Sequence, residues 1–506
     1  MKVIALGHSA YLLEMDTDGG IPVRILADPW FGDYVIGDLQ GRFPRLRFEA
    51  SALAPLHAIF LSHSHTDHLD PYSLVSLWQQ LDEKPTVLLP ESLRFLRDLL
   101  MEHLKGVHLV FLRDRQPVDV RGLSVLGFFN PETAATNEDD VMVLVARNNT
   151  EVFIAESDAV LPLYHPLGRD VVQSLLAAED AETLCFMTTK NEGDATMSML
   201  SASDAADRQQ RLAQSLEATT EEIQDLYAPI EDDDFWQNDR LVRLIGGQGI
   251  CFPQTLAQDK GHDWNRVLFP IRLAQRVQME REVAADCLCS HTIEEAIPGQ
   301  IHSLGDGRLL ERRTLRNVEL LDREEDREFD GSLDLFEDFP VAPVYPEDRN
   351  EEDQRRRILA CLNERFLPHL IGARNPPIEH ILGQNGGEYR IRIRCGTAEK
   401  NNETDYRIRF EGLRFVETEV TDGATGEPDE HYWANDLEDF LDGRCDEFST
   451  ICRHPLPACE LRLWRCLGLP YLNNDLIEKK LRLHFERASR GESLEEWILG
   501  FYRDSL

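Results

Sequence analysis

The sequence predicts an α+β protein in which helices pack against β-sheets. Over the first 190 residues, short apolar runs typical of strands alternate with amphipathic patterns typical of helices. The same mixture returns after residue 354, where two runs of alternating apolar and charged residues stand between helical patterns. A chain of 506 residues is also too long for one ordinary hydrophobic core, so we expect more than one domain.

Most of the predicted strands lie in the first part of the chain. Gly19 and Gly20 predict a tight turn that joins the second and third of them into a hairpin. The run at 57–62 is almost wholly apolar, which is typical of a strand buried on both faces, and 70–81 has the apolar spacing of an amphipathic helix. The expected strands cover 2–6, 10–15, 23–28, 57–62, 86–90, 107–112, 123–129, 141–146 and 151–157.

Composition divides the rest of the chain. Residues 200–245 are polar, acidic and helix-prone, which predicts a helical insertion. Residues 318–353 are acidic and rich in proline towards their end, which is typical of a linker. We therefore expect a first domain over 1–317 that contains the insertion, and a smaller α+β domain over 354–506.

The chain is strongly acidic, with a formal net charge of −38. Recognition of a phosphate backbone needs a basic face, so this charge argues against a nucleic-acid partner. We expect no integral membrane segment, because no apolar stretch has the length of a membrane span, and no secretory signal is visible. Ten cysteines are scattered with none in a CxxC pair, which is typical of reduced thiols. These features predict a cytoplasmic protein.

The strongest chemical signal directly follows the apolar run at 57–62. His63, His65, Asp67 and His68 form the pattern H-x-H-x-D-H within six residues. In an extended loop, residues two apart point the same way, so His63 and His65 can converge on one ion while Asp67 and His68 face a second. Imidazole nitrogen and carboxylate oxygen are ligands for zinc and for iron. The pattern predicts a site for one or two metal ions; histidines that only cap a helix are the alternative.

This pattern, the strand before it and the upstream segment GHSAYLLE…ILADPWFGD together resemble the metallo-β-lactamase fold superfamily. The GHS and DPW elements look like the branch that contains L-ascorbate-6-phosphate lactonase, N-acylphosphatidylethanolamine phospholipase D and the lactamase-like part of CMP-N-acetylneuraminate hydroxylase. The later segments CFPQTLAQDKGHDWN and IPGQIHSLGDG are similar to the hydroxylase. The resemblance covers roughly residues 1–310 and implies an αββα sandwich with metals at one edge of the two sheets.

The resemblance also implies further metal ligands. Asp158 ends an apolar strand, as the family's bridging aspartate does. The family's third metal-binding histidine is replaced by Asn130, whose amide is a poorer zinc ligand than imidazole and can instead orient water or substrate. The final histidine is absent as well, and Glu192 or His262 is the candidate for its place. The sequence leaves open whether such a set holds one metal, favours iron, or is a decayed site kept for binding.

Two residues upstream of the cluster are expected near the metal edge. The resemblance places His8, after the first strand, where it contacts substrate or supports a metal ligand. Asp28 resembles a carboxylate that orients a ligating imidazole through its free N–H. Local turn chemistry is the alternative for both, since Asp-Pro starts many turns. Three scattered histidines without such a context are expected at the surface, namely His165, His291 and His302.

The leading hypothesis for function is a metal-dependent hydrolase. His63, His65, Asp67, His68 and Asp158 would hold zinc, and a metal-bound hydroxide would attack an ester, lactone, amide or phosphodiester bond of a small-molecule substrate. Asp67 is the candidate catalytic residue for proton transfer. The first alternative is an iron-dependent oxygenase whose electrons come from a separate redox partner, because the chain lacks the Cys/His pairs of a Rieske domain. A non-catalytic binding protein with a degenerate site is the second.

Overall fold

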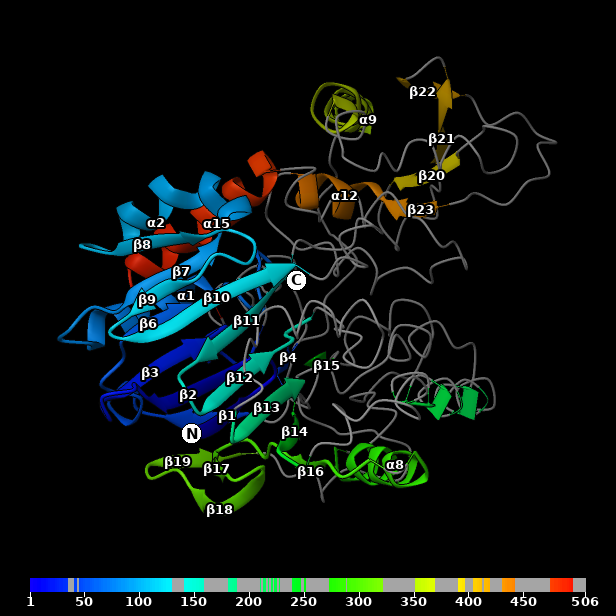
Figure 1. Cartoon of the computed structure of the whole chain (residues 1–506). Helices are drawn as coiled ribbons and strands as arrows, with labels where there is room; N and C mark the ends of the chain where they lie inside the picture. Colours follow the sequence, from blue (N-terminus) through cyan, green and yellow to red (C-terminus); the bar gives the residue numbers. More distant parts are fainter. Residues whose placement is uncertain are drawn as a thin grey trace.

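The computed structural model of the chain shows two β-sheets that face one another, with helices on the outer side of each (Figure 1). Only part of the chain is described. The described residues are 1–34, 41–42, 45–129, 141–158, 181–188, 239–246, 250–251, 273–287, 289–321, 351–368, 390–395, 404–411, 414–418, 430–441 and 474–494, with separate positions between 210 and 227.

The first sheet has eight strands in the order β18-β17-β1-β2-β3-β6-β7-β8. Strands β1, β2 and β3 are antiparallel neighbours, whereas β3, β6, β7 and β8 are parallel. The predicted hairpin is confirmed, since β2 pairs with β3 and Gly20 turns the chain with a φ of 72°. The bounds are β1 (Lys2–Gly7), β2 (Ala10–Asp16), β3 (Pro22–Ala27), β6 (Ala58–Phe60), β7 (Thr86–Pro90), β8 (His108–Leu112), β17 (Gln300–Gly305) and β18 (Arg308–Thr314).

The second sheet has seven strands in the order β16-β14-β13-β12-β11-β10-β9. Strands β9 to β12 form an antiparallel meander, and β12, β13, β14 and β16 are parallel. The bounds are β9 (Val118–Val120), β10 (Leu123–Phe129), β11 (Met142–Arg147), β12 (Glu151–Ala155), β13 (Thr183–Thr188), β14 (Leu241–Ile245) and β16 (Thr292–Glu295).

Alternating side chains of each strand fill two different layers. Val3 and Ala5 of β1 lie between the sheets, where they join Phe153 from β12 of the opposite sheet. Ile4 and Leu6 of the same strand face the helices on the outer side. Strands buried on both faces read as continuous apolar runs, which is why the sequence shows them so clearly. The αββα sandwich implied by the resemblance is confirmed by this arrangement.

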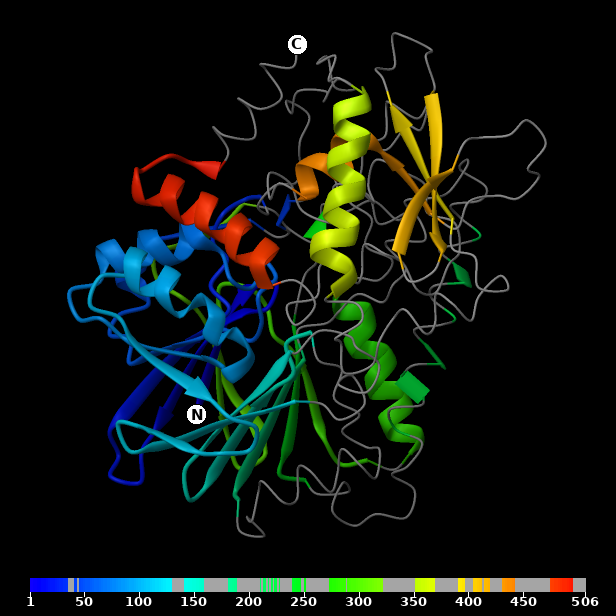
Figure 2. The same ribbon diagram turned by 90° about the horizontal axis from the view of Figure 1, so that it is seen from above.

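The outer face of the first sheet is covered by α1 (Pro71–Gln80), η2 (Glu91–Leu96), α2 (Arg97–His103) and α15 (Asn474–Ser489). The predicted helix at 70–81 is α1. Asp70 caps it by accepting backbone N–H groups of Tyr72 and Ser73. Helix α15 comes from far along the chain, yet it lies beside α1 and α2 (Figure 2), and Leu481 and Phe485 enter the same apolar cluster as Leu74.

The outer face of the second sheet is covered by α8 (Leu273–Asp286). Ile223 and Tyr227, which are helical positions of the predicted insertion, pack into the same cluster. Two small strand pairs lie outside the main sheets: β4 (Gly41–Arg42) with β15 (Ile250–Cys251), and β5 (Leu46–Phe48), which precedes η1 (Ala50–Ala52), with β19 (Val318–Leu320). None of the described helices is long and apolar enough to cross a membrane.

The smaller α+β unit expected after residue 354 is seen in part. A four-stranded sheet has the order β22-β21-β20-β23, and α9 and α12 contact it. The runs of alternating apolar and charged residues form β20 and β21, as predicted. The bounds are α9 (Glu351–Cys361), η5 (Leu362–Phe366), β20 (Arg390–Cys395), β21 (Thr404–Glu411), β22 (Arg414–Thr418), β23 (Glu430–Trp433) and α12 (Ala434–Leu441).

Three described elements depart from the predicted boundaries. The helical insertion was expected to extend to 245, but residues 241–245 form β14, an inner strand of the second sheet whose residues are all buried. The expected linker begins too early at 318, because β19 pairs with β5. Helix α15 was expected in the C-terminal domain, but its apolar residues complete the core of the first unit. The other domain limits remain predictions.

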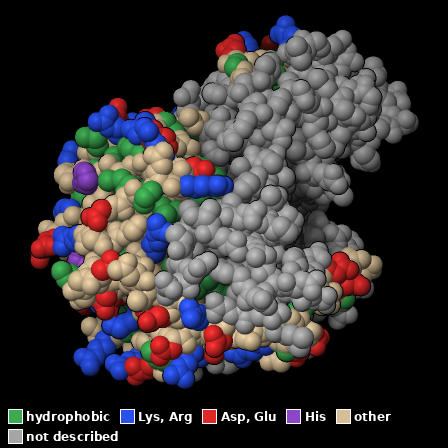
Figure 3. All heavy atoms as spheres, in the orientation of Figure 1, with side chains coloured by type: hydrophobic (Ala, Val, Ile, Leu, Met, Phe, Trp, Pro, Cys, Tyr) green, Lys and Arg blue, Asp and Glu red, His purple; other side chains and the backbone are tan. Residues whose placement is uncertain are grey.

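Charged side chains of both signs cover the described part of the surface. In the orientation of Figure 3, Lys and Arg alternate with Asp and Glu over the two-sheet unit. On the described part of this view, the net charge of −38 therefore does not form one continuous acidic patch. Such interspersion is typical of a solvated protein surface.

Candidate metal centre

The predicted metal ligands lie where strands of both sheets end. Strands β1, β3 and β6 run in the same direction, and their carboxyl ends lead into His8, Asp28 and the cluster at 63–68. In the facing sheet, β12 leads into Asp158. Loops that follow parallel strands share one edge of a sheet, which is where such folds gather binding groups. Four segments that are distant in sequence thus bring polar side chains to one place.

Three of these loops contain a residue with left-handed backbone conformation. The φ angle is 47° at His8, 41° at Asp28 and 52° at Ser157. This region is sparsely populated by residues other than glycine, with Asp and Asn the most tolerant, and it recurs at functional sites. Here it ends the strands abruptly and keeps the three residues at the edge of the sheets.

Asp28 is the centre of a buried hydrogen-bond network. Its Oδ1 accepts the backbone N–H of Ser62 at 2.8 Å, and its Oδ2 accepts the hydroxyls of Ser62 at 2.7 Å and Ser157 at 3.0 Å. The same Oδ2 lies 3.0 Å from Nδ1 of His68. When Nδ1 of His68 donates its proton to Asp28, Nε2 keeps a lone pair for a metal. This is the geometry that the expected orienting role of Asp28 requires.

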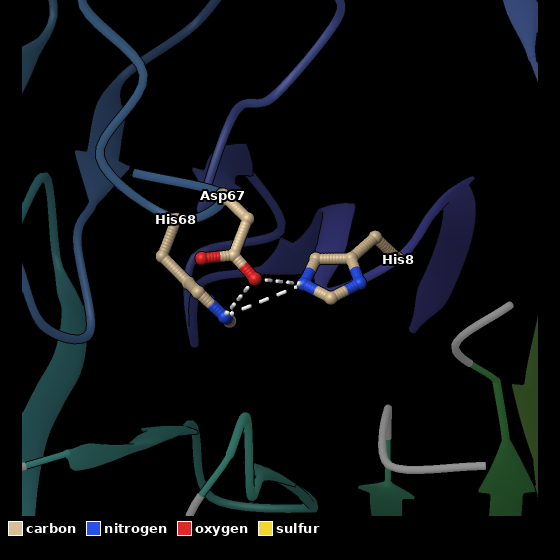
Figure 4. Close-up of side chains that lie close together, drawn as sticks. All are labelled: His8, Asp67 and His68. Atoms are coloured by element: carbon tan, nitrogen blue, oxygen red, sulfur yellow. Dashed lines mark hydrogen bonds and ion pairs between the residues drawn. The ribbon is translucent and has the colours of Figure 1, made fainter. Parts of the chain in front are cut away.

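His8, Asp67 and His68 form a compact triangle (Figure 4). Oδ2 of Asp67 lies 2.9 Å from Nε2 of His8 and 3.5 Å from Nε2 of His68. The two imidazole Nε2 atoms are 3.4 Å apart. His68 is fully buried, Asp67 is 7% exposed, and the His8 side chain is 13% exposed. Three potential ligand atoms therefore meet at a nearly enclosed point.

A second group of ligand atoms overlaps the first through His68. Oδ2 of Asp158 lies 3.1 Å from Nε2 of His68 and 3.6 Å from Nε2 of His63. Nδ1 of His63 lies 2.9 Å from the Ser62 hydroxyl, which fixes the ring from behind. The ring of His65 packs against that of His63 with centroids 4.5 Å apart, but within the described part of the chain it belongs to neither group.

Opposite charges support one another in this cluster. Burial alone would lower the pKa of His68, but the carboxylates of Asp158 and Asp67 raise that pKa well above the ordinary histidine value. Burial would raise the pKa of Asp67, yet His68 and the hydrogen bond from His8 hold it far below its usual range. Burial would likewise raise the pKa of Asp158, but the charge of His68 and its hydrogen bond lower it. The carboxylates thus require positive charge, which a divalent cation can supply.

The donor set fits a divalent transition metal. Zinc binds imidazole nitrogen and carboxylate oxygen at about 2.0–2.2 Å, so two ligand atoms at tetrahedral corners are separated by about 3.3–3.6 Å. The separations described above run from 2.9 to 3.6 Å. Each of the two groups also combines two imidazoles with one carboxylate, which is a donor set suited to zinc or iron.

The structure does not place all of the predicted site residues. Asn130, Glu192 and His262 lie outside the described residues, as does His165. His291 is half-buried.

The expectation of a surface position for His302 was wrong, because His302 is fully buried. It pairs with Val3 of β1, whose side chain faces the layer between the sheets. The backbone N–H of Ile297 donates to its Nε2 at 3.3 Å. A single polar residue in an alternating strand run is easily taken for an outward position, which explains the error.

Several residues around the site were not foreseen. Ser62 and Ser157 hold Asp28, and the Trp30 ring packs edge-on against His8 with centroids 5.3 Å apart. Trp30 is itself anchored, since its indole N–H donates to the Tyr34 carbonyl at 3.1 Å. The DPW segment contained the signal for Trp30. Nothing in the sequence distinguishes the two serines from ordinary turn residues.

A buried ionic group lies behind the Asp158 loop. Glu156, two residues before Asp158, approaches Arg243 of β14, with Oε1 and Nη1 3.9 Å apart. Arg243 in turn donates from Nε to Glu280 of α8 at 2.6 Å, and Arg276 donates to the same carboxylate at 3.1 Å. Burial raises the pKa of Glu156 to about 7, although Arg243 opposes this shift. The group ties the end of β12 to the outer helix.

Comparisons with known proteins give only distant likenesses. No protein-family model matches the sequence, and no curated protein matches it. Among solved structures, CmlA, a diiron β-hydroxylase from Streptomyces venezuelae, is 12% identical with a TM-score of 0.35; the match covers 60% of this chain and 54%, about half, of CmlA.

Two further solved structures are similar in part. The metallo-β-lactamase fold protein YhfI from Bacillus subtilis is 11% identical with a TM-score of 0.29, over 60% of this chain and 99% of YhfI. A flavo di-iron protein variant from Thermotoga maritima is 13% identical with a TM-score of 0.21, over 35% and 47%. Likenesses of this size say nothing about the reaction. The two-sheet topology and the cluster of histidines and aspartates at its edge carry the functional inference instead.

Proposed function

We propose that the chain is a metal-dependent hydrolase that acts on an ester, lactone, amide or phosphodiester bond of a small molecule. One observation carries the proposal. Side chains that follow three strands bring imidazole and carboxylate atoms into contacts of 2.9–3.6 Å, around the buried rings of His63 and His68. Packing alone gives no reason to bury so many ionisable groups together, because each loses its hydration.

The residues divide into ligands and supports. A bound zinc ion would supply a hydroxide at neutral pH and draw charge from the bond under attack. His63, His68 and Asp158 offer ligand atoms, and Asp28 fixes the His68 ring. Asp67, whose Oδ2 lies 2.9 Å from Nε2 of His8, is in this proposal the group that assists proton transfer beside the metal.

Substrate approaches from the side of Asp158 in this proposal. The Asp158 side chain is 35% exposed, whereas His63 and His68 are at most 1% exposed. A metal site that is open on the side of Asp158 leaves room for a reacting bond next to the ion, as catalytic metal sites require.

Metal analysis of the purified full-length chain tests the proposal. We expect about one or two zinc ions per chain and hydrolysis of at least one chromogenic ester, lactone or phosphodiester. His68→Ala should abolish both, because His68 belongs to both ligand groups. His108→Ala, which changes an exposed histidine on β8, is the control and should leave both unchanged. Equal metal content in His68→Ala and the parent chain would refute the site.

An iron-dependent oxygenase is the second candidate. Both ligand groups consist of two histidines and one aspartate, which is the donor set that non-haem iron oxygenases use. Electrons would then come from a separate redox protein. Iron as the metal retained from iron-supplemented growth, with reductant-dependent oxygen uptake and no hydrolysis, would favour this reading over the first.

A further inference from the structure

The two ligand groups cannot both use His68. Its Nε2 atom belongs to the His8–Asp67–His68 group and to the His63–His68–Asp158 group. An imidazole nitrogen has one lone pair, and Nδ1 of His68 is already committed to Asp28 at 3.0 Å. His68 therefore binds a single ion, together with residues whose ligand atoms lie close both to His68 and to one another.

His8 is the imidazole in direct contact with Asp67 and groups with it and His68. Its Nε2 lies 2.9 Å from Oδ2 of Asp67 and 3.4 Å from Nε2 of His68 (Figure 4). Oδ2 of Asp158 lies 3.1 Å from the same His68 atom, but its close group is the one with His63 and not the one with His8 and Asp67. A single ion about 2.0–2.2 Å from each atom would have ligand separations of about 3.3–3.6 Å. The ligand atoms of His8, Asp67 and His68, with separations of 2.9–3.5 Å, thus surround one position.

The backbone and surroundings of His8 also indicate a demanding role. His8 has a φ of 47°, and Gly7 before it has a φ of 92°. Residues other than glycine are uncommon in this region, and histidine is, with Asn and Asp, among the more tolerant of them. The Trp30 ring packs edge-on against the His8 ring and restricts its orientation. The turn and the Trp30 contact together hold this imidazole at the buried carboxylate.

We propose that His8 is a direct metal ligand and that it forms a three-residue site with Asp67 and His68. This proposal rests on the proposed function only in requiring that the chain binds a metal. It assigns the donor beside Asp67 and His68 to the loop after the first strand. It also leaves His63 and Asp158, whose ligand atoms are 3.6 Å apart, to a separate and less complete position.

A substrate-contacting His8 is the main competing role. In that case the 2.9 Å contact with Asp67 is an ordinary charge-assisted hydrogen bond, and the ion does not depend on His8. A third role is purely orienting, in which His8 holds Asp67 and Asp67 binds the ion. Metal affinity distinguishes ligation by His8 from substrate contact. A count of the nitrogens bound to the metal distinguishes ligation from the orienting role.

The test is Co²⁺ and Zn²⁺ binding to the full chain and to His8→Asn. Asparagine tolerates the left-handed backbone at this position better than alanine does, so the variant preserves the local conformation while removing the imidazole. We expect the dissociation constant of the tighter Co²⁺ site to rise by more than about 100-fold, since even supporting residues around metals are worth about 10–100-fold. X-ray absorption should count one imidazole fewer around any Co²⁺ that remains. Circular dichroism and thermal unfolding of the apo-protein confirm that the variant is folded.

Two control variants make failure interpretable. His108→Ala should bind Co²⁺ as the parent chain does, and His68→Ala should lose the tighter site. If His68→Ala loses the metal while His8→Asn retains parent affinity and the same nitrogen count, the role of His8 is refuted and the hydrolase proposal stands. If His68→Ala also binds like the parent chain, the metal site itself is refuted. Should His8→Asn prove unfolded, His8→Gly, which suits the same backbone, replaces it.

Discussion

At the scale of single residues, the site depends on carboxylates that are themselves held in place. Asp28 contacts His68 through Oδ2 and receives three further hydrogen bonds from Ser62 and Ser157. An amide at this position cannot accept through both atoms, so one donor would lose its partner and the His68 ring would lose its fixed tautomer.

Asp28→Asn should therefore weaken zinc binding without removing a ligand. We expect a loss of about 10–100-fold in affinity, which is typical when a carboxylate behind a metal-bound histidine is removed. Competition with a chromogenic chelator measures it. Asp98→Asn, on the exposed side of α2, is the matched control and should bind zinc as the parent chain does. An unchanged affinity in Asp28→Asn would mean that the network does not orient His68.

His302 makes stability depend on pH. Burial, reinforced by Arg312, lowers its pKa to about 4, and the ring is neutral in the fold because Nε2 accepts the Ile297 N–H. The unfolded chain takes up this proton near pH 6.5, so stability is present above that pH and is lost as pH falls towards 4. His302 alone should account for about 2 kcal/mol between about pH 7 and pH 5.

Urea unfolding of the parent chain and His302→Gln at both pH values measures this contribution. Glutamine does not titrate, so the variant should lose less of its unfolding free energy than the parent chain does on acidification. A pH dependence identical in the two proteins would show that His302 is protonated in the fold or is not the responsible group.

The residues of the site were predictable to the extent that they are adjacent in sequence. The H-x-H-x-D-H pattern predicted that His63, Asp67 and His68 share one site, and the resemblance predicted the same of Asp158; the structure brings these side chains together. The closeness of His8 to Asp67 depends on β1 and β6 lying in one sheet, which no local pattern reveals. His302 was misjudged because burial in a strand depends on the neighbouring layer as well as on the residue type.

At the scale of elements, α15 is the clearest addition to what the sequence shows. It crosses from the C-terminal region to cover α1 and α2 and buries Ile477, Leu481 and Phe485 in their cluster. Tyr72 of α1 meets His484 of α15, with the hydroxyl 3.0 Å from Nδ1. Since α1 starts directly after Asp70, α15 supports the helix that follows the metal-binding loop.

Phe485→Ala should destabilise the first unit as well as the helix that carries it. Removal of a buried phenylalanine side chain typically costs about 3–5 kcal/mol. Chemical unfolding followed by tryptophan fluorescence should report this loss, because Trp78 lies in the same cluster. Glu486→Ala changes the exposed neighbour and should be within about 0.5 kcal/mol of the parent chain. Equal stability of the two variants would contradict the packing of α15.

The sequence predicted strands correctly where both faces are apolar. The predicted boundaries were wrong where a short strand lies beside a polar or acidic segment. Strand β14 directly follows a polar, acidic stretch, and β19 opens a segment whose later part is rich in acid and proline. A composition window averages over such short strands. Their pairing partners, β13 and β5, supply the hydrogen bonds that make them strands, and those partners are far away in sequence.

At the scale of the whole molecule, the sequence predicted the class and the two-sheet sandwich but not the path of the chain. The αββα arrangement followed from the resemblance over roughly residues 1–310. The packing of residues 474–489 against that unit could not be predicted from the resemblance. An apolar stripe shows that a helix is buried on one side, but it does not show which surface covers that side. The domain limits drawn from composition therefore separate segments that fold together.

The docking of α15 has a consequence for how the protein is made. The apolar stripe on α1 and α2 stays uncovered during synthesis until residue 489 has left the ribosome. The loop that precedes α1 is then attached to a helix that still lacks its packing partner. A nascent chain stalled before residue 474 therefore presents an exposed apolar strip, which is a surface that chaperones bind.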